Sequence, residues 1–122
     1  MKLKILPQDF SICKLNSLKS VDLTDEYFFL ARTDEEISLV CSSDRVPSDV
    51  EVCEPGWRCF RIEGTLDFAL VGILARISSL LADQGISIFA VSTYNTDYVL
   101  TKAEQFEQAT AVLKEEGWEI TG

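Results

Sequence analysis

Apolar and polar residues follow a regular pattern in the second half of the chain. Between residues 58 and 63, apolar side chains alternate with Arg61 and Glu63, which is the period-two pattern of a half-buried strand. From residue 70 to residue 82, apolar side chains recur on one helical face, and Gly85 follows as a C-terminal stop. The pattern therefore predicts a strand followed by a long amphipathic helix.

Strand and turn signals continue to the C-terminus. Three more strands are predicted by β-prone residues that lie next to turn residues, at 86–93, 98–101 and 118–121. Between the last two, Thr101 and Glu104 have the spacing of a capping box, and the helix that they introduce ends at Gly117. The resulting order, βαββαβ, predicts an α+β, ferredoxin-like fold.

The first half of the chain looks like a shortened copy of the second. Residues 29–40 parallel residues 89–100 at an offset of 60, with Thr33 in the position of Thr93. The first copy is about ten residues shorter ahead of this segment, which corresponds to roughly three helical turns. We therefore expect it to lack most of its first helix and to keep only a short second helix near 47–50.

A linker is predicted where the two copies meet. Residues 51–57 contain Pro55 and Gly56, a dipeptide typical of turns. The predicted domains are a shortened half at 1–56 and a complete half at 57–122. Fusion is physically reasonable, since a unit of about 60 residues buries too little surface to be more than marginally stable alone. Chance similarity between the halves is the alternative.

Composition narrows the possible function classes. The chain has 122 residues, with 20 acidic residues against 11 basic ones, no histidine and a net charge of −9. This charge argues against a nucleic-acid partner, because phosphate contacts need a basic face. The lack of histidine removes His-dependent catalysis and imidazole metal sites, and we expect no metal and no cofactor. No apolar run is long enough to span a membrane.

The four cysteines fit a reducing compartment. The N-terminal residues lack an apolar core long enough for a secretory signal, so we expect a cytoplasmic protein with reduced thiols. The cysteines form no Cys-x-x-Cys pair and are expected to pack as small hydrophobic side chains. Cys59, close to Arg58 and Arg61, is a weak candidate for a nucleophile.

Two stretches carry candidate binding chemistry. Gly72 lies early in the predicted helix, where a glycine leaves room for a ligand near the helix amides; close helix–strand packing is the alternative. The turn after Ser92 combines hydroxyl, amide and carboxylate side chains, and Asp97 is suited to pair with an ammonium or guanidinium group. Turn geometry alone is the alternative explanation there.

These stretches resemble the ACT-domain family. The resemblance rests on EGTLDFALVG at 63–72, GISIFAVSTY at 85–94 and NTDYVL at 95–100. It is specific over about residues 57–102 and weaker over the first fifty residues. Within the family, the chain is most similar to small tandem-ACT bacterial proteins and to the ligand-binding halves of the cytosolic arginine sensors known as CASTOR proteins.

The resemblance implies a binding site for a small effector, most often an amino acid, where two ACT domains meet. In this family the loop into the first helix and the neighbouring second strand bind the ligand, and the other copy closes the pocket. Transferred by position, the implied ligand-binding residues are Leu70, Val71, Gly72, Thr93, Tyr94, Asp97 and, from the other copy, Ser38 and Leu39.

The resemblance thus implies a non-enzymatic regulatory module that binds a small amino acid. The arginine sensors have longer chains with more ACT copies, so a homodimer is expected to complete the site. One alternative is a structural dimerisation module without a ligand. Another is a ferredoxin-like enzyme such as an acylphosphatase, which needs a cationic phosphate cradle where this sequence carries Asp67.

Overall fold

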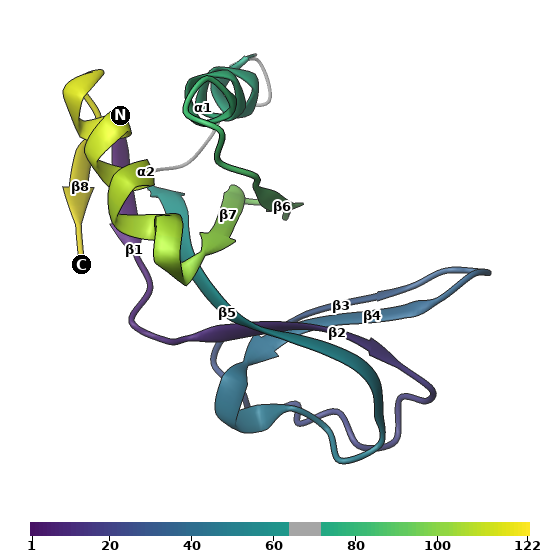
Figure 1. Cartoon of the computed structure of the whole chain (residues 1–122). Coiled ribbons are helices and arrows are strands. Elements are labelled where there is room, and N and C mark those ends of the chain that lie inside the picture. The colour runs from purple at the N-terminus through teal and green to yellow at the C-terminus, as the bar shows by residue number, and fades with distance from the viewer. Residues whose placement is uncertain (64–71) are drawn as a thin grey trace. The chain divides into compact units, whose positions relative to one another are not determined.

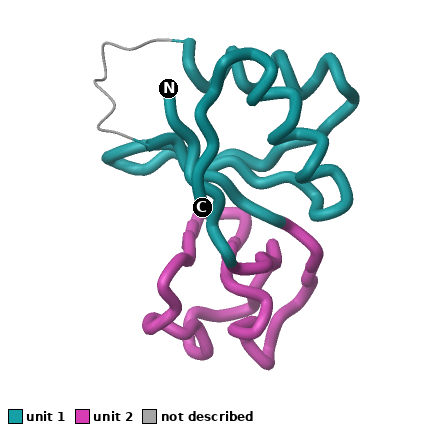
Figure 2. Tube along the Cα trace, turned by 90° about the vertical axis from the view of Figure 1, so that its left-hand side faces the viewer, with its two compact units in different colours: residues 1–7, 58–122 teal, residues 8–57 magenta. Residues whose placement is uncertain are grey.

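The computed structural model describes residues 1–63 and 72–122 and divides the chain into two compact units. Figure 2 shows the division: one unit comprises residues 8–57, and the other combines residues 1–7 with residues 58–122. We call them the smaller and the larger unit. The N-terminal residues belong to the larger unit, and in this respect the compact units differ from the predicted halves at 1–56 and 57–122.

The larger unit contains a sheet in the order β6-β7-β5-β1-β8 (Figure 1). Its strands are β1 (Lys2–Ile5), the second part of β5 (Val50–Glu63), β6 (Phe89–Ser92), β7 (Asp97–Lys102) and β8 (Glu119–Thr121). β1 runs antiparallel to β5 and parallel to β8, and it separates these two strands. Leu3 pairs with Ile62 and both side chains are fully buried, which explains why the N-terminal strand joins this unit.

Two helices cover this sheet, α1 (Ile73–Ala82) and α2 (Ala103–Glu115). Their apolar residues recur at helical spacing and form one buried cluster with the strands. The fully buried members of the cluster are Leu3, Phe60, Ile62, Ile77, Leu81, Val99, Ala109 and Leu113. Phe106 of α2 packs against Phe60 of β5 with 6.2 Å between ring centroids. The predicted βαββαβ order is therefore confirmed from β5 to β8.

The start of α2 differs from the prediction. Thr101 is fully buried in β7 and donates its hydroxyl hydrogen bond to the carbonyl of Lys102 at 3.2 Å. Lys102 is the N-cap residue and forms no side-chain capping bond. The predicted capping box of Thr101 and Glu104 is therefore wrong, because burial of Thr101 in the sheet moves the helix start one residue on.

The smaller unit contains the same kind of sheet without α-helices. Its strands are β2 (Phe10–Leu15), β3 (Phe29–Arg32), β4 (Ile37–Ser42) and the first part of β5, in the order β3-β4-β2-β5. The short helix η1 is a 3₁₀ turn at Ser43–Arg45, several residues before the helix predicted near 47–50. One cluster of its apolar core has Cys13, Leu15, Leu39 and Cys41 as buried members, and Phe10 and Val40 are buried as well.

The internal similarity extends to strand register. In the smaller unit Phe29 pairs with Val40, and in the larger unit Phe89 pairs with Leu100, so the two hairpins share one register at an offset of 60. The N–H of Thr33 donates to the carbonyl of Glu36 at 2.9 Å, and Thr93 bonds to Thr96 over the same distance. The parallel predicted from the sequence thus holds in pairing and in turn geometry.

The predicted linker is part of a strand. Residues 51–57 lie inside β5, whose partners in β2 shift register between Phe10 and Ile12. Phe10 pairs with Trp57 and Ile12 with Glu54, so β5 holds one extra residue there. Gly56 has φ 85°, the left-handed conformation of a bulge glycine. Pro55 and Gly56 therefore form a β-bulge, and the predicted turn is wrong.

Candidate functional site

Thr96 anchors the hairpin that joins β6 to β7. Its side chain is buried, and its Oγ1 donates to the carbonyl of Ile62 in β5 at 2.7 Å. At the other end of the turn, both the N–H and the Oγ1 of Thr93 donate to the carbonyl of Thr96 at 2.9 Å. The two bonds of Thr93 therefore close the turn, and the bond of Thr96 fixes it to β5.

Asp97 follows this anchor directly and opens β7. It pairs with Ser92 in the ladder and is half-buried. Among the described residues, its carboxylate forms no hydrogen bond and no ion pair. Tyr94 is 84% exposed at the tip of the turn. The hairpin thus brings Thr93, Tyr94 and Asp97 into one turn, and it leaves the carboxylate free to accept from a cationic group.

A charged cluster that the sequence analysis did not single out lies on the neighbouring strands. Arg61 of β5 donates to Oε1 of Glu63 from Nη2 at 2.8 Å and from Nε at 3.2 Å. Its guanidinium carbon lies 5.8 Å from the ring centroid of Tyr98 in β7. Hydrogen bonding to Tyr98 and to Glu63 raises the pKa of Arg61. Arg61 thus forms its ion pair with Glu63, and among the described residues no ion pair joins it to Asp97.

The signal for this cluster was present in the sequence. Arg61 and Glu63 occupy the polar positions of the alternating strand, so they had to project from the same face of β5. Nothing in the sequence places Tyr98 beside them, because that contact depends on the pairing of β5 with β7.

Gly72 is the N-cap of α1 and does not lie inside the helix as predicted. Its φ is 85°, and a Cβ placed on it would meet nothing within 4 Å. The glycine is therefore required by its left-handed conformation and not by close packing. α1 has no side-chain capping bond among the described residues. The amides of its first turn carry the partial positive charge that favours a carboxylate.

The other expected contributors are not all on this hairpin. Leu70 and Val71 lie outside the described residues. Ser38 and Leu39 are on β4 in the smaller unit, where they pair with Lys14 and Cys13 of β2. Leu39 is only 1% exposed and its side chain belongs to the core of that unit, whereas Ser38 is half-buried. The proposed pairing of these residues with the hairpin stays a prediction.

Cys13, Cys41 and Cys59 are buried, and Cys53 is half-buried. Burial raises the pKa of Cys41 to about 11 and that of Cys59 to about 12. Cys13 lies opposite Cys53 in the ladder, and burial raises its pKa as well. A thiol with such a pKa is protonated at neutral pH, which argues against Cys59 as a nucleophile.

Two further features concern metal binding and membrane insertion. Within residues 1–63 and 72–122, no group of three or more His, Cys, Asp or Glu side chains is arranged to hold a metal ion. Neither helix formed by these residues combines the length and the apolar character needed to cross a membrane.

Several solved structures are similar to this chain. The Agobacterium tumefaciens protein Atu0741 is 34% identical, with a TM-score of 0.86 and coverage of 98% of this chain and 90% of that one. The Vibrio cholerae protein VC0802, described as a possible transport protein of unknown function, is 21% identical over 93% of this chain and 88% of that one, with a TM-score of 0.73.

A third similar structure comes from a regulatory protein. The regulatory subunit of aspartate kinase from Thermus thermophilus has a TM-score of 0.63 and 11% identity, and the match covers 93% of this chain and 95% of that one. At this identity and at that of the Vibrio protein, the likeness concerns the fold alone. No curated protein sequence matches the chain significantly.

Family models match both parts of the sequence. A model of an N-terminal domain matches residues 8–49, and the model described as ACT domain matches residues 52–115. The latter match spans more than half of the chain and includes α1, α2 and the anchored hairpin. This match agrees with the βαββαβ order of the larger unit, and the protein therefore belongs to the ACT-domain family.

Proposed function

We propose that the protein is a regulatory module that binds a small amino acid and has no catalytic activity of its own. The ligand lies between the entrance of α1 and the β6–β7 hairpin. Backbone amides at Gly72 and beyond bind the ligand carboxylate, and Asp97 binds its ammonium group. The observation that carries this proposal is the carboxylate of Asp97, which is half-buried beside an anchored turn and has no partner within residues 1–63 and 72–122.

Family membership supports the regulatory part of the proposal. The chain resembles the regulatory subunit of aspartate kinase in fold and covers nearly all of it. The ACT-domain match supports a role in binding a small ligand. The likeness to arginine sensors remains a prediction, so the proposal names the class of ligand and not one amino acid.

Other residues complete the proposed site. Leu70 and Val71 supply backbone groups ahead of Gly72, and Thr93 and Tyr94 border the ligand on the hairpin. Ser38 and Leu39 contribute from a second subunit, so that ligand binding stabilises a homodimer. A ligand that binds the dimer in preference to the monomer shifts that equilibrium, which is the means of regulation.

The test is a thermal-shift scan with each of the standard amino acids at millimolar concentration. A ligand at about 100 times its Kd stabilises the folded state by about 2.7 kcal/mol, which raises the Tm by several degrees. We expect Asp97→Asn to abolish the shift. Asp34→Asn is the matched control, because Asp34 is an exposed carboxylate on the corresponding turn of the smaller unit.

Light scattering with and without the same amino acids separates the alternatives. A rise in dimer fraction with the active amino acid supports the proposal. A stable dimer whose Tm ignores every amino acid would instead identify a structural dimerisation module. Hydrolysis of an acyl phosphate by the purified protein would contradict the non-enzymatic part of the proposal.

A further inference from the structure

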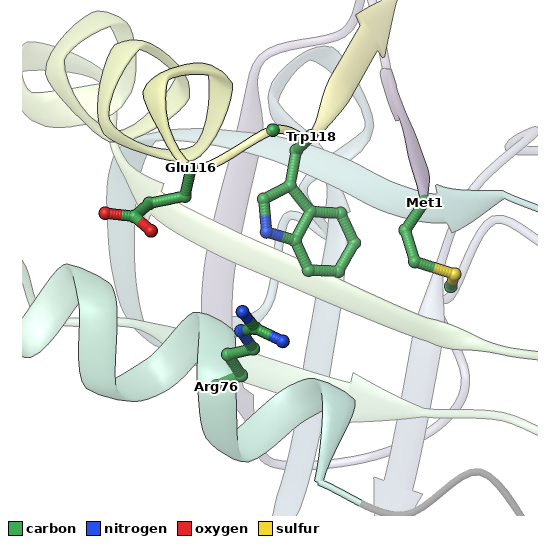
Figure 3. Close-up of a pocket in the computed structure, with 5 residues that line it drawn as sticks. Met1, Arg76, Glu116 and Trp118 are labelled. Carbon is green, nitrogen blue, oxygen red and sulfur yellow. The ribbon is translucent and has the colours of Figure 1, made fainter.

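A cavity of about 140 Å³ lies in the larger unit, away from the hairpin just described. It is lined by Met1, Arg76, Glu116, Gly117 and Trp118 (Figure 3). None of Gly72, Thr93 and Asp97 is among its lining residues. It is therefore a separate feature from the proposed ACT ligand site.

The turn after α2 builds one wall of this cavity. Gly117 has φ 96°, its N–H donates to the carbonyl of Lys114, and the N–H of Trp118 donates to the carbonyl of Leu113, both at 3.1 Å. These two bonds define a Schellman motif. Trp118 is 8% exposed and packs in the core beside Leu113. The indole is thus held in place and presents a fixed surface to the cavity.

Two side chains of opposite charge, Arg76 and Glu116, line the cavity. Figure 3 shows the guanidinium of Arg76 reaching from α1 toward the indole of Trp118, with Glu116 on the α2 side of the cavity. Among the described residues, neither Arg76 nor Glu116 has a hydrogen bond from its side chain or an ion pair, and no ion pair joins them.

The other arginines of the larger unit are engaged elsewhere. Arg58 donates to the carbonyl of Leu6 and lies 5.0 Å from the ring centroid of Phe106. Arg61 bonds to Glu63 at 2.8 Å. Arg76 is therefore the arginine of the described part of this unit whose guanidinium remains available, and it faces a cavity.

The C-terminal end of α2 and the N-terminal half of α1 favour ligand groups of opposite charge. Glu115 and Glu116 stand at the C-terminal end of α2, where the helix dipole favours cations and disfavours carboxylates. Helix stability does not explain two acidic residues there. A bound ammonium group would compensate the Glu116 carboxylate. Arg76 lies in the N-terminal half of α1, where the dipole favours an anion.

We propose that this cavity binds a small zwitterionic α-amino acid. Its carboxylate pairs with the Arg76 guanidinium, its ammonium group pairs with Glu116, and its short side chain lies against the indole of Trp118. Glycine and alanine carry both charges with the smallest side chains, so they are the simplest ligands of this class.

Tryptophan fluorescence tests the proposal directly. The chain has two tryptophans, and the variant Trp57→Phe leaves Trp118 as the only tryptophan, whose emission is excited selectively at wavelengths that tyrosine does not absorb. Glycine and L-alanine are titrated against this variant, with acetate and methylammonium as ligands that carry one charge each. We expect saturable binding of glycine or alanine, and at least about tenfold weaker binding of either single-charge ligand.

Substitutions at the two charges complete the test. Arg76→Gln and Glu116→Gln each remove one charge from an exposed side chain, so the fold is retained, as circular dichroism will verify. Each is expected to weaken binding at least about tenfold. Glu115→Gln is the matched control: it also removes a carboxylate from the end of α2, but it does not line the cavity, and binding should stay within twofold.

The outcomes distinguish this cavity from the ACT ligand site. Loss of the Trp118 response in Arg76→Gln and Glu116→Gln, with an unchanged response in Asp97→Asn, supports a second site. Absence of a response in the parent variant overturns the proposal, as does equal binding of acetate and glycine. Loss in Asp97→Asn with no loss in Arg76→Gln overturns it too, and leaves the proposed function standing.

Discussion

The larger and the smaller unit arrange their strands in the same way and cover them differently. In both, a hairpin of the same register pairs through its second strand with a further strand, which is β2 in the smaller unit and β5 in the larger one. In the larger unit α1 and α2 bury a cluster of large apolar side chains. In the smaller unit, loops and one 3₁₀ turn cover a core that includes Cys13 and Cys41.

This difference locates the candidate binding groups in the larger unit. The turn of the smaller unit has the same backbone hydrogen bond, yet the residue at the position of Thr96 is Glu36, which is exposed. Only the larger unit has an α-helix, α1, after β5 in the chain, and only its turn is anchored by a buried hydroxyl. The two sheets are therefore alike, and the candidate binding groups come from the start of α1 and from the turn residues of the larger unit.

The helix-covered core should be the most sensitive to truncation. Phe60 is fully buried between the sheet and α2, and Phe60→Ala is expected to lower the free energy of unfolding by about 3–5 kcal/mol. Urea denaturation followed by circular dichroism measures the loss. Phe60→Leu keeps most of the apolar volume and should cost much less; equal losses would show that the ring does not pack as described.

A polar substitution in the thiol-containing core of the smaller unit should lower the free energy of unfolding. Cys41→Ser places a more polar hydroxyl in an apolar core where only the thiol of Cys13 is beside it, and we expect a loss of about 1–3 kcal/mol in unfolding free energy. Cys53→Ser is the control, since Cys53 is only half-buried. The same denaturation experiment checks both, and a neutral Cys41→Ser would remove the distinction drawn between the two cores.

The anchored turn can be compared with its counterpart. Thr96→Val preserves shape but removes the bond to Ile62, which leaves a buried carbonyl without that donor and should cost about 1 kcal/mol. Glu36→Ala changes the corresponding exposed residue and should stay within about 0.5 kcal/mol. If thermal denaturation shows equal effects, the anchor does not distinguish the two turns.

The smallest expected effect concerns the loop that replaces a helix in the smaller unit. Hydrogen bonds from Thr24 and Arg45 lower the pKa of Asp22 from 3.8 to about 2. The carboxylate therefore stabilises the fold fully above pH 3.8, and the contribution disappears as the pH falls to about 2. The Tm difference between the natural protein and Asp22→Asn should follow this course. A constant difference from pH 2 to pH 7 would contradict it.

Much of the fold was predictable from the sequence because it depends on local periodicity. The alternation at Arg61 and Glu63 and the helical spacing before Gly85 fixed the strand and the helix of the larger unit. The β1 pairing was not predictable, since it joins residues at opposite ends of the chain. Pro55 and Gly56 have the composition of a turn, and only the partner strand makes them a bulge.

The candidate site was predictable in part for the same reason. Thr93, Tyr94 and Asp97 lie within five residues, so any hairpin brings them together. The contact of Arg61 with Tyr98 and the bond from Thr96 to Ile62 depend on how β7 lies beside β5. The Arg76 and Glu116 cavity needs two helices to meet, which no single stretch of sequence reveals.

The position of β1 has a consequence for synthesis on the ribosome. β1 precedes residues 8–57 in the chain and its neighbour β8 follows them, and Thr121 donates a hydrogen bond to the carbonyl of Leu3 across 118 positions. All strands of the sheet of residues 8–57 are present once residue 57 has been synthesised. The smaller unit therefore has its whole sheet before β6, β7 and β8 are made, whereas the larger unit completes its sheet only when β8 has joined β1.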